Sequence, residues 1–169
     1  MGVGCESCHG PGGQHVEAMR QGKTDALFMP KLQKQDGKTI AEMCGRCHRT
    51  TKDATAKNLN SEHTDLFQAH GLEQSRCYRE GQNKLSCTSC HDPHTSISTD
   101  EKTYNQVCLQ CHAPANIPIT TRLLQRRPCP INATEKCTSC HMPKRAEPVF
   151  PGSPHKVADH FIRVQKEKK

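Results

Sequence analysis

Cys5-Glu6-Ser7-Cys8-His9 is the first of five Cys-x-x-Cys-His pentapeptides in this chain of 169 residues. The other four are Cys44–His48, Cys87–His91, Cys108–His112 and Cys137–His141. This pentapeptide is the attachment site of a c-type haem, in which both thiols bond to the porphyrin and the adjacent His binds the iron. The sequence therefore predicts five haem c groups, attached through Cys5, Cys8, Cys44, Cys47, Cys87, Cys90, Cys108, Cys111, Cys137 and Cys140.

A bare Cys-x-x-Cys also occurs in zinc knuckles, thioredoxin-like redox pairs and iron–sulfur sites. Zinc knuckles need such pairs in twos, and this chain has five. Thioredoxin-like pairs lie beside a βαβ pattern rich in Val and Ile, which this sequence lacks. Neither alternative requires His directly after the second Cys, so haem attachment is favoured over a set of zinc or redox sites.

The apolar content is too low for an ordinary globular core. Apolar residues, Cys included, make up 33% of the chain, and there is no Trp. Such a chain buries too little of its own surface to offset the conformational entropy of folding, so we expect the porphyrins to form the core. The expected fold is mainly α with extensive loop and little or no sheet, as one pentahaem cytochrome domain over residues 1–169. The haem-free chain is expected to be unfolded.

The pattern of apolar and breaker residues predicts short helices near 13–22, 39–48, 61–71, 102–112, 119–127 and 156–166. Two of them run directly into motifs, which would place both thiols on one side of a helix, one turn apart. Residues 49–60 and 145–154 are expected to be connecting loops, and Pro148, Pro151 and Pro154 interrupt the second.

The chain has a formal net charge of +7 with His neutral. Each ferric haem with two ionised propionates contributes about −1, so the surplus Lys and Arg are better explained as propionate partners than as a nucleic-acid surface. There is no apolar run long enough to span a membrane. We therefore expect neither nucleic acid nor a membrane span among the partners.

Haem c is attached outside the bacterial cytoplasmic membrane, where disulfides also persist. The expected location is therefore periplasmic or extracellular. The first motif begins at residue 5, so we expect that a secretory signal has been removed or that the chain is part of a longer precursor.

Eleven His are present, and the five motif residues His9, His48, His91, His112 and His141 supply one axial ligand each. The remaining six are His15, His63, His70, His94, His155 and His160. Five irons and six spare imidazoles predict bis-His ligation throughout, with His63 as the residue most easily left over. The three residues from His91 to His94 reach about 10 Å at full extension, so His94 is expected to serve a neighbouring haem, and His15 to do the same relative to His9.

Several segments resemble the multihaem cytochrome c superfamily that includes pentahaem nitrite reductase, octahaem hydroxylamine oxidoreductase and octahaem tetrathionate reductase. The segments that carry the resemblance are Cys5 to His15, His70 to Cys77, Cys87 to His94, Cys140 to Lys144, and the end of the chain with His155 and Asp159 to Arg163. The resemblance covers nearly the whole chain. It implies that His15, His70, His94, His155 and His160 are the distal ligands and that His63 is not. Relatives usually carry further haem sites upstream, so the resemblance also suggests a C-terminal part or short form of a longer cytochrome.

Cys77 and Cys129 lie outside the motifs. In an oxidising compartment two such cysteines suggest a disulfide, which would close a loop of about 52 residues and add roughly 4 kcal/mol of stability. Two buried thiols are the alternative.

Bis-His ligation leaves no open iron position, so electron transfer is favoured over catalysis. The expected partners are a redox donor and a redox acceptor, which dock through small, salt-sensitive contacts. A homo-oligomer or filament, or an upstream haem domain, would extend the row of haems. One alternative is a multihaem oxidoreductase that acts on nitrogen or sulfur oxyanions at one open haem. The nitrite reductases of the superfamily have Lys in place of the motif His, whereas all five motifs here end in His. A haem subunit of a larger complex is the third hypothesis.

Overall fold

The structure is a computed structural model, and it describes residues 3–24, 28–32, 35–58, 66–81, 84–113, 129, 131, 134–146 and 156–165. The chain divides into two compact units, Met1–Gln35 and Asp36–Lys169. The expected single domain over residues 1–169 stays a prediction.

The first unit holds two helices, α1 (Glu6–His9) and α2 (Gly13–Arg20). Helix α1 ends at Gly10, whose φ of 72° lies in the left-handed region that favours glycine. The Glu6 carboxylate then accepts the main-chain N–H of Gly12 at 2.6 Å, which closes the turn before α2. Helix α2 confirms the prediction of a helix near 13–22.

The second unit contains the other helices and one small sheet. The helices are α3 (Gly37–His48), α4 (Thr51–Ala56), α5 (Gln68–Gln74), α6 (Arg76–Glu80), α7 (Cys87–Cys90), α8 (Glu101–His112) and α9 (Cys137–His141). Strands β1 (Lys144–Ala146) and β2 (Lys156–Ala158) pair antiparallel, with Arg145 opposite Val157. The described part of the chain is thus mainly helical with loops, as the sequence predicts.

Aspartates start the two longest helices. Asp36 accepts the main-chain N–H of Thr39 at 2.9 Å at the start of α3, and Asp100 accepts that of Lys102 at 2.9 Å at the start of α8. These N-caps satisfy donors that have no partner within the helix. Each helix then ends on a motif His, His48 or His112. The predicted helices near 39–48 and 102–112 are therefore confirmed.

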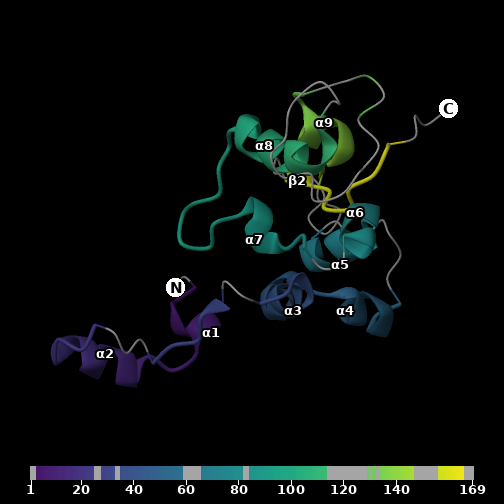
Figure 1. The fold of residues 1–169 in the computed structure, drawn as a ribbon. Helices are drawn as coiled ribbons and strands as arrows, with labels where there is room; N and C mark the ends of the chain where they lie inside the picture. Colours follow the sequence, from purple (N-terminus) through teal and green to yellow (C-terminus); the bar gives the residue numbers. More distant parts are fainter. Residues whose placement is uncertain are drawn as a thin grey trace. The chain divides into compact units, whose positions relative to one another are not determined.

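The helices that carry the last four motifs are in contact in chain order. Helix α7 contacts both α3 and α8, and α8 contacts α9. On the other side of α3, helix α5 packs against α3, α4 and α6 (Figure 1). The second to fifth motifs therefore follow one another in space as they do in sequence.

The apolar core of the described residues is small. Its buried side chains are Ala18, Ile40, Ala41, Ala54, Phe67, Ala69, Leu72 and Tyr78, of which four are alanines. Ser75, Asn105 and Asp159 are buried polar residues of the second unit. Polar contacts must therefore fix much of the packing.

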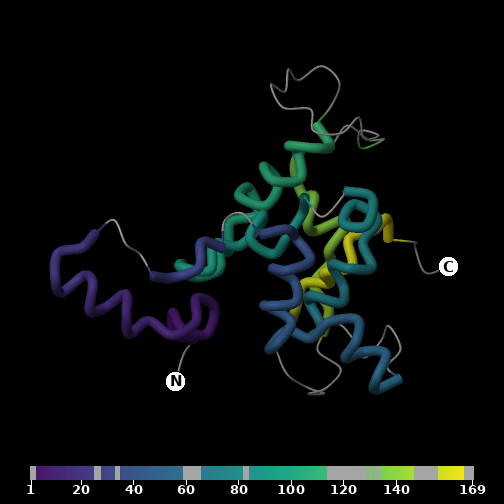
Figure 2. The backbone as a smooth tube through the Cα atoms, turned by 60° about the horizontal axis from the view of Figure 1, so that its bottom comes forward, coloured from purple at the N-terminus to yellow at the C-terminus, as the bar shows by residue number. Residues whose placement is uncertain are grey.

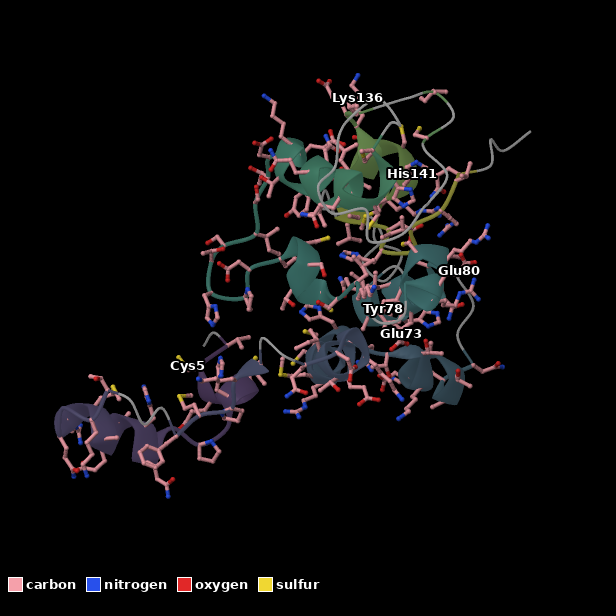
Figure 3. The ribbon with its side chains drawn as sticks, viewed as in Figure 1. Cys5, Glu73, Tyr78, Glu80, Lys136 and His141 are labelled. Atoms are coloured by element: carbon pink, nitrogen blue, oxygen red, sulfur yellow. The ribbon has the colours of Figure 1, made fainter. Side chains whose placement is uncertain are left out.

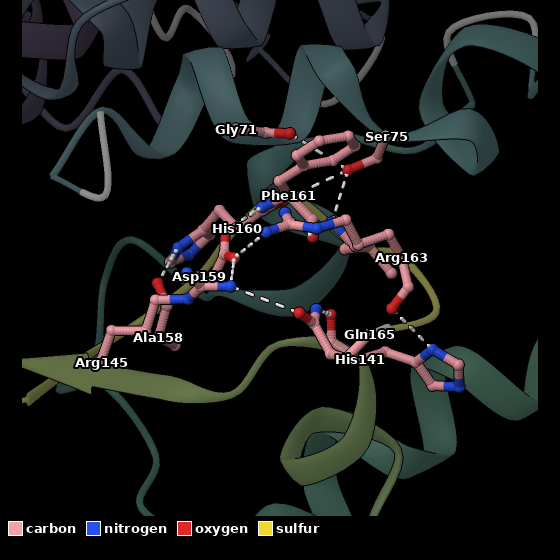
Figure 4. Close-up of polar contacts among 11 residues, drawn as sticks. Gly71, Ser75, His141, Arg145, Ala158, Asp159, His160, Phe161, Arg163 and Gln165 are labelled. Atoms are coloured by element: carbon pink, nitrogen blue, oxygen red, sulfur yellow. Dashed lines mark hydrogen bonds and ion pairs between the residues drawn. The ribbon is translucent and has the colours of Figure 1, made fainter. Parts of the chain in front are cut away.

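Ser75 ties the C-terminal segment to the junction of α5 and α6. It is fully buried, and its hydroxyl oxygen accepts the Ile162 main-chain N–H at 2.8 Å. The carbonyl oxygens of Gly71 and His160 both lie within donor reach of this hydroxyl, at 3.1 and 3.2 Å (Figure 4). A Cβ at Gly71 would lie only 3.0 Å from the main chain of His160 and Phe161, so glycine permits this close approach. Figure 2 shows the yellow C-terminal segment beside the teal helices.

Two of the expected elements are wrong. Residues 49–60 were expected to be a loop, but Thr51–Ala56 form α4, because Thr50 and Asp53 make a capping box in which the Asp53 carboxylate accepts the Thr50 N–H at 2.7 Å. A last helix was expected near 156–166, but Lys156–Ala158 form β2 and residues 159–165 are irregular, because β1 and Ser75 take their main-chain hydrogen bonds.

Other expected elements are described only in part. The expected helix near 61–71 begins at Gln68 within the described residues and continues to Gln74. The expected helix near 119–127 and the three prolines of the expected loop lie outside the described residues.

Replacing Ser75 by Ala (S75A) is expected to destabilise the haem-loaded protein by about 1–3 kcal/mol, because the Ile162 N–H loses its buried acceptor. The measurement is denaturant unfolding. The matched control is S96A at an exposed serine, which should change stability by less than about 0.5 kcal/mol. Equal unfolding midpoints for S75A and S96A would contradict the anchoring role of Ser75.

Candidate haem-binding sites

The two cysteines of every motif have helical backbone, and of the motif histidines only His91 lies beyond its helix, in extended backbone. Cys5 has helical backbone angles immediately before α1, the second and fourth motifs end α3 and α8, and the third and fifth begin α7 and α9. Figure 3 labels Lys136, the residue before the fifth motif, and His141, its last residue. Residues i and i+3 share a helix face, so both thiols of each motif lie on one side, as attachment to a single porphyrin requires.

The thiols of neighbouring motifs touch. Cys44 of the second motif and Cys87 of the third share a hydrogen bond, which lowers the pKa of Cys44 to about 7 and raises that of Cys87. Cys108 of the fourth motif and Cys137 of the fifth also share one. Burial is the main cause that raises the pKa of Cys108 to about 12. The attachment points of the second and third motifs are therefore adjacent, and so are those of the fourth and fifth.

One carboxylate clamps the fourth motif helix to the fifth. Glu101 Oε1, on α8, accepts the Ser139 N–H at 3.0 Å and the hydroxyls of Thr138 and Ser139 at 2.8 Å each. Nearby on α8, Asn105 Oδ1 accepts the Cys137 N–H at 3.0 Å. Thr138 and Ser139 are the two residues between the cysteines of the fifth motif, so the clamp holds the attachment site itself.

Several predicted iron ligands have their Nδ1 atoms held by oxygen acceptors. The pairs are His9 with the Pro30 carbonyl at 3.3 Å, His48 with Gln68 Oε1 at 3.2 Å, His141 with the Arg163 carbonyl at 3.1 Å, and His160 with the Ala158 carbonyl at 2.9 Å. A carbonyl oxygen only accepts, so Nδ1 carries the hydrogen in each pair. In His48, His141 and His160 this tautomer leaves Nε2 to bind a metal, the usual arrangement of a ligating His.

The imidazole rings of His91 and His160 lie close together in the second unit. Their ring centres are 6.2 Å apart and their planes differ by 37°. Two imidazoles that bind one metal from opposite sides, with metal–nitrogen bonds of about 2 Å, have ring centres about 6 Å apart. Burial is the main cause that lowers the pKa of both rings, so both are held in the neutral form that binds a metal.

A buried carboxylate fixes the segment that carries His160. Asp159 Oδ2 lies 3.1 Å from Arg145 Nη2 and 3.0 Å from Arg163 Nη2, and Asp159 Oδ1 accepts the Phe161 N–H at 2.9 Å (Figure 4). Arg145 is on β1, and His160 follows β2, which pairs with β1. The ion pairs of Asp159 and the sheet therefore fix the position of the His160 ring.

The remaining predicted ligands are less closely gathered. His15 is half-buried on α2 of the first unit, and His112 is half-buried at the end of α8. His94 is exposed, with its Nδ1 at 3.3 Å from Asp92. His63 and His155 lie outside the described residues.

The structure does not contain the expected disulfide between Cys77 and Cys129. Cys77 and Cys129 are both half-buried thiols.

Sequence reasoning missed the residues that position the motifs. Gln68 and Asp159 lie within two residues of the predicted ligands His70 and His160, and this closeness in sequence could have indicated their role. Nothing local marks Glu101 or Asn105, because their partners are more than 30 residues away in the chain.

These observations fit haem c. The thiols are paired on helix faces, the imidazoles expose Nε2, and two rings stand at the separation that one iron between them requires. Among the described residues, no three His, Cys, Asp or Glu side chains gather as a metal cluster of their own. Within the same residues, every helix is too short or too polar to cross a membrane.

Comparisons with known proteins support the same cofactor. A family model described as a doubled CXXCH motif matches residues 78–117, which include the third and fourth motifs. The chain is 27% identical over 163 residues to a protein named multiheme cytochrome MtrA from Shewanella baltica (strain OS185). The match covers 90% of this chain and 46% of that protein, so the chain spans about half the length of this relative. No solved structure matches. The narrower resemblance to nitrite, hydroxylamine and tetrathionate enzymes stays a prediction.

Replacing Glu101 by Gln (E101Q) is expected to lower stability at neutral pH but not in strong acid. Hydrogen bonds from Ser139 and Thr138 hold the pKa of the Glu101 carboxyl below its ordinary value of 4.5. A carboxyl with a lowered pKa in the folded state contributes stability above its unfolded pKa and loses it as the pH falls through the folded pKa. The Tm difference between wild type and E101Q should therefore be constant well above pH 4.5 and shrink below it.

The control is E135Q, at an exposed glutamate two residues before the fifth motif, which should show no such pH-dependent difference. A Tm difference for E101Q that persists unchanged into strong acid would contradict the clamp.

Proposed function

We propose that this multihaem c-type cytochrome carries electrons along a row of five bis-His haems. Electron transfer through c-type haems is supported by the family match and by the multihaem relative. The number five rests on the five motifs. The observation that carries the proposal is the contact order α3, α7, α8 and α9, which would bring the second to fifth haems edge to edge.

The haem supplies one-electron chemistry, and the chain supplies position and surroundings. The paired thiols would fix where each porphyrin edge lies, and the hydrogen bonds on Nδ1 of His48 and His141 would leave Nε2 to bind an iron. Burial lowers the pKa of His91 and His160, which favours the neutral form that an iron ligand needs. With an imidazole on both faces, no iron position is left for a substrate, so the chain would pass electrons rather than transform a molecule.

For the third haem, we propose His91 as the motif ligand and His160 as the distal ligand. Their separation of 6.2 Å supports this pairing. His94 then remains for a neighbouring haem, in keeping with its short tether to His91. The distal ligands His15, His70 and His155 are proposed from the sequence resemblance.

We also propose a periplasmic or extracellular location, because haem c is attached outside the bacterial cytoplasm. The partners would be a redox donor and a redox acceptor, docked through small contacts that weaken with salt. Association with further haem domains or further copies would lengthen the row, which agrees with a relative about twice as long as this chain.

The chain of 169 residues is expected to weigh 18.9 kDa plus five covalent haem groups, and all five ferric irons should be low-spin. Intact-mass spectrometry, the pyridine haemochrome spectrum and low-temperature electron paramagnetic resonance (EPR) measure these quantities. A high-spin resting iron that shifts on addition of nitrite or hydroxylamine would instead favour an oxidoreductase with one open haem. A mass equal to the bare polypeptide would overturn the proposal.

Replacing His160 by Ala (H160A) is expected to convert one of the five irons to high spin, because the third haem loses its distal ligand. EPR counts the signals. The control is H63A, which should leave all five irons low-spin, since His63 is not among the predicted ligands.

The pairing itself is tested with a protein that lacks the third haem, C87A/C90A. Adding H160A to that background should create no high-spin iron. A new high-spin signal there would assign His160 to a different haem.

A further inference from the structure

His70 is joined to a carboxylate through a threonine hydroxyl. His70 Nδ1, on α5, lies 3.0 Å from Thr51 Oγ1, and the same hydroxyl is hydrogen-bonded to Glu73 Oε2. Glu73 Oε2 also accepts the Thr51 main-chain N–H at 3.0 Å, so the carboxylate bridges from α5 to the start of α4 (Figure 3). All three residues are half-buried.

The direction of each hydrogen bond follows from the chemistry of the three groups. An ionised carboxylate only accepts, so the Thr51 hydroxyl must donate its proton to Glu73. The Thr51 oxygen can then only accept from His70, which places the hydrogen on Nδ1 and leaves Nε2 as the ligating atom. The contact is therefore a directed chain from imidazole through hydroxyl to carboxylate.

This chain distinguishes His70 from the other described ligand candidates. His48 donates to a neutral amide, and His141 and His160 donate to main-chain carbonyls. His94 lies beside Asp92, but the two side chains are 75% and 58% exposed, so water screens that pair. Of the carboxylate-linked imidazoles in the described residues, His70 is the one in a half-buried setting.

A carboxylate at the far end of such a chain draws the Nδ1 proton away from the ring and makes Nε2 a stronger electron donor. A stronger donor favours the ferric over the ferrous iron. Hydrogen bonding beyond the axial ligand is one of the means by which a protein sets a haem potential.

We propose that Glu73, acting through Thr51, is a positioning and tuning residue that lowers the reduction potential of the haem capped by His70. This inference rests on the proposed function, in which His70 is a distal ligand. The reduction potential of one haem in the row would therefore be lower than its axial ligands alone would give.

The test is a spectroelectrochemical titration of the haem-loaded E73Q variant. One of the five one-electron components should shift to a more positive potential while the other four stay in place. T51V, which removes the hydroxyl, should give the same shift, and T51S, which keeps it, should restore the wild-type potential. A residue with a merely structural role would not show this rescue by serine.

The matched control is E80Q, because Glu80 on α6 is a nearby carboxylate that pairs with the exposed Arg76 (Figure 3). It removes the same charge and should leave all five potentials unchanged. Equal shifts for E73Q and E80Q would reduce the effect to net charge, and no shift for E73Q would overturn the inference.

The H70A variant separates failure of this inference from failure of the proposed function. If H70A converts one iron to high spin but E73Q leaves every potential unchanged, His70 is a ligand and only the tuning role is refuted. If H70A leaves all irons low-spin, then His70 is not a ligand, and both the proposed ligand set and the tuning role fail.

Discussion

The arrangement of the motif helices depends on hydrogen bonds from a few buried or half-buried polar side chains, because the apolar core is too small to fix it. Half of the buried apolar residues are alanines, whose burial contributes little. By contrast, Ser75 makes three main-chain contacts, and Glu101 accepts three hydrogen bonds on one oxygen. All of these contacts except the one between Ser75 and Gly71 join segments far apart in the chain. The polypeptide therefore acts mainly as a set of anchors, and apolar burial would come from the porphyrins it binds.

Two motifs with the same sequence show how far these anchors differ. The third and fifth motifs both read Cys-Thr-Ser-Cys-His. In the third, Ser89 folds back on Ser86 in a local capping box that starts α7. In the fifth, the Ser139 hydroxyl donates a hydrogen bond to Glu101 on α8, and Lys136 precedes α9 with a left-handed φ of 58°. The first arrangement is complete within four residues, whereas the second needs a partner helix. Identical attachment sequences thus acquire different rigidity from their tertiary surroundings.

The sequence predicts elements that depend on neighbouring residues, and it does not predict contacts between residues far apart in the chain. The motif helices near 39–48 and 102–112 follow from aspartate caps and a continuous helical pattern, and both are present. Helix α4 was missed although its capping box, Thr50 to Asp53, is visible in the sequence. Strand β2 could not be foreseen, because three residues have no strand pattern of their own and pair only when β1 is in place. The proximity of His91 and His160 likewise depends on Ser75 and Asp159, whose contacts span up to 87 residues.

Five haems with the same axial ligands would have similar potentials in the same surroundings, so a useful gradient must come from what lies behind each imidazole. The described residues supply a graded set of such surroundings. His91 Nδ1 is buried and has no hydrogen-bond partner within the described part of the chain, His48 has an amide, His141 and His160 have main-chain carbonyls, and His70 has a hydroxyl that leads to a carboxylate. Donor strength should be lowest for His91 and highest for His70, because a hydroxyl bound to a carboxylate withdraws the Nδ1 proton more strongly than the neutral carbonyls beside His48, His141 and His160. Apart from the local contact of His160 with Ala158, these acceptors come from segments distant in the chain and not from the motifs, so under the proposed function the order of potentials would be encoded outside the motifs.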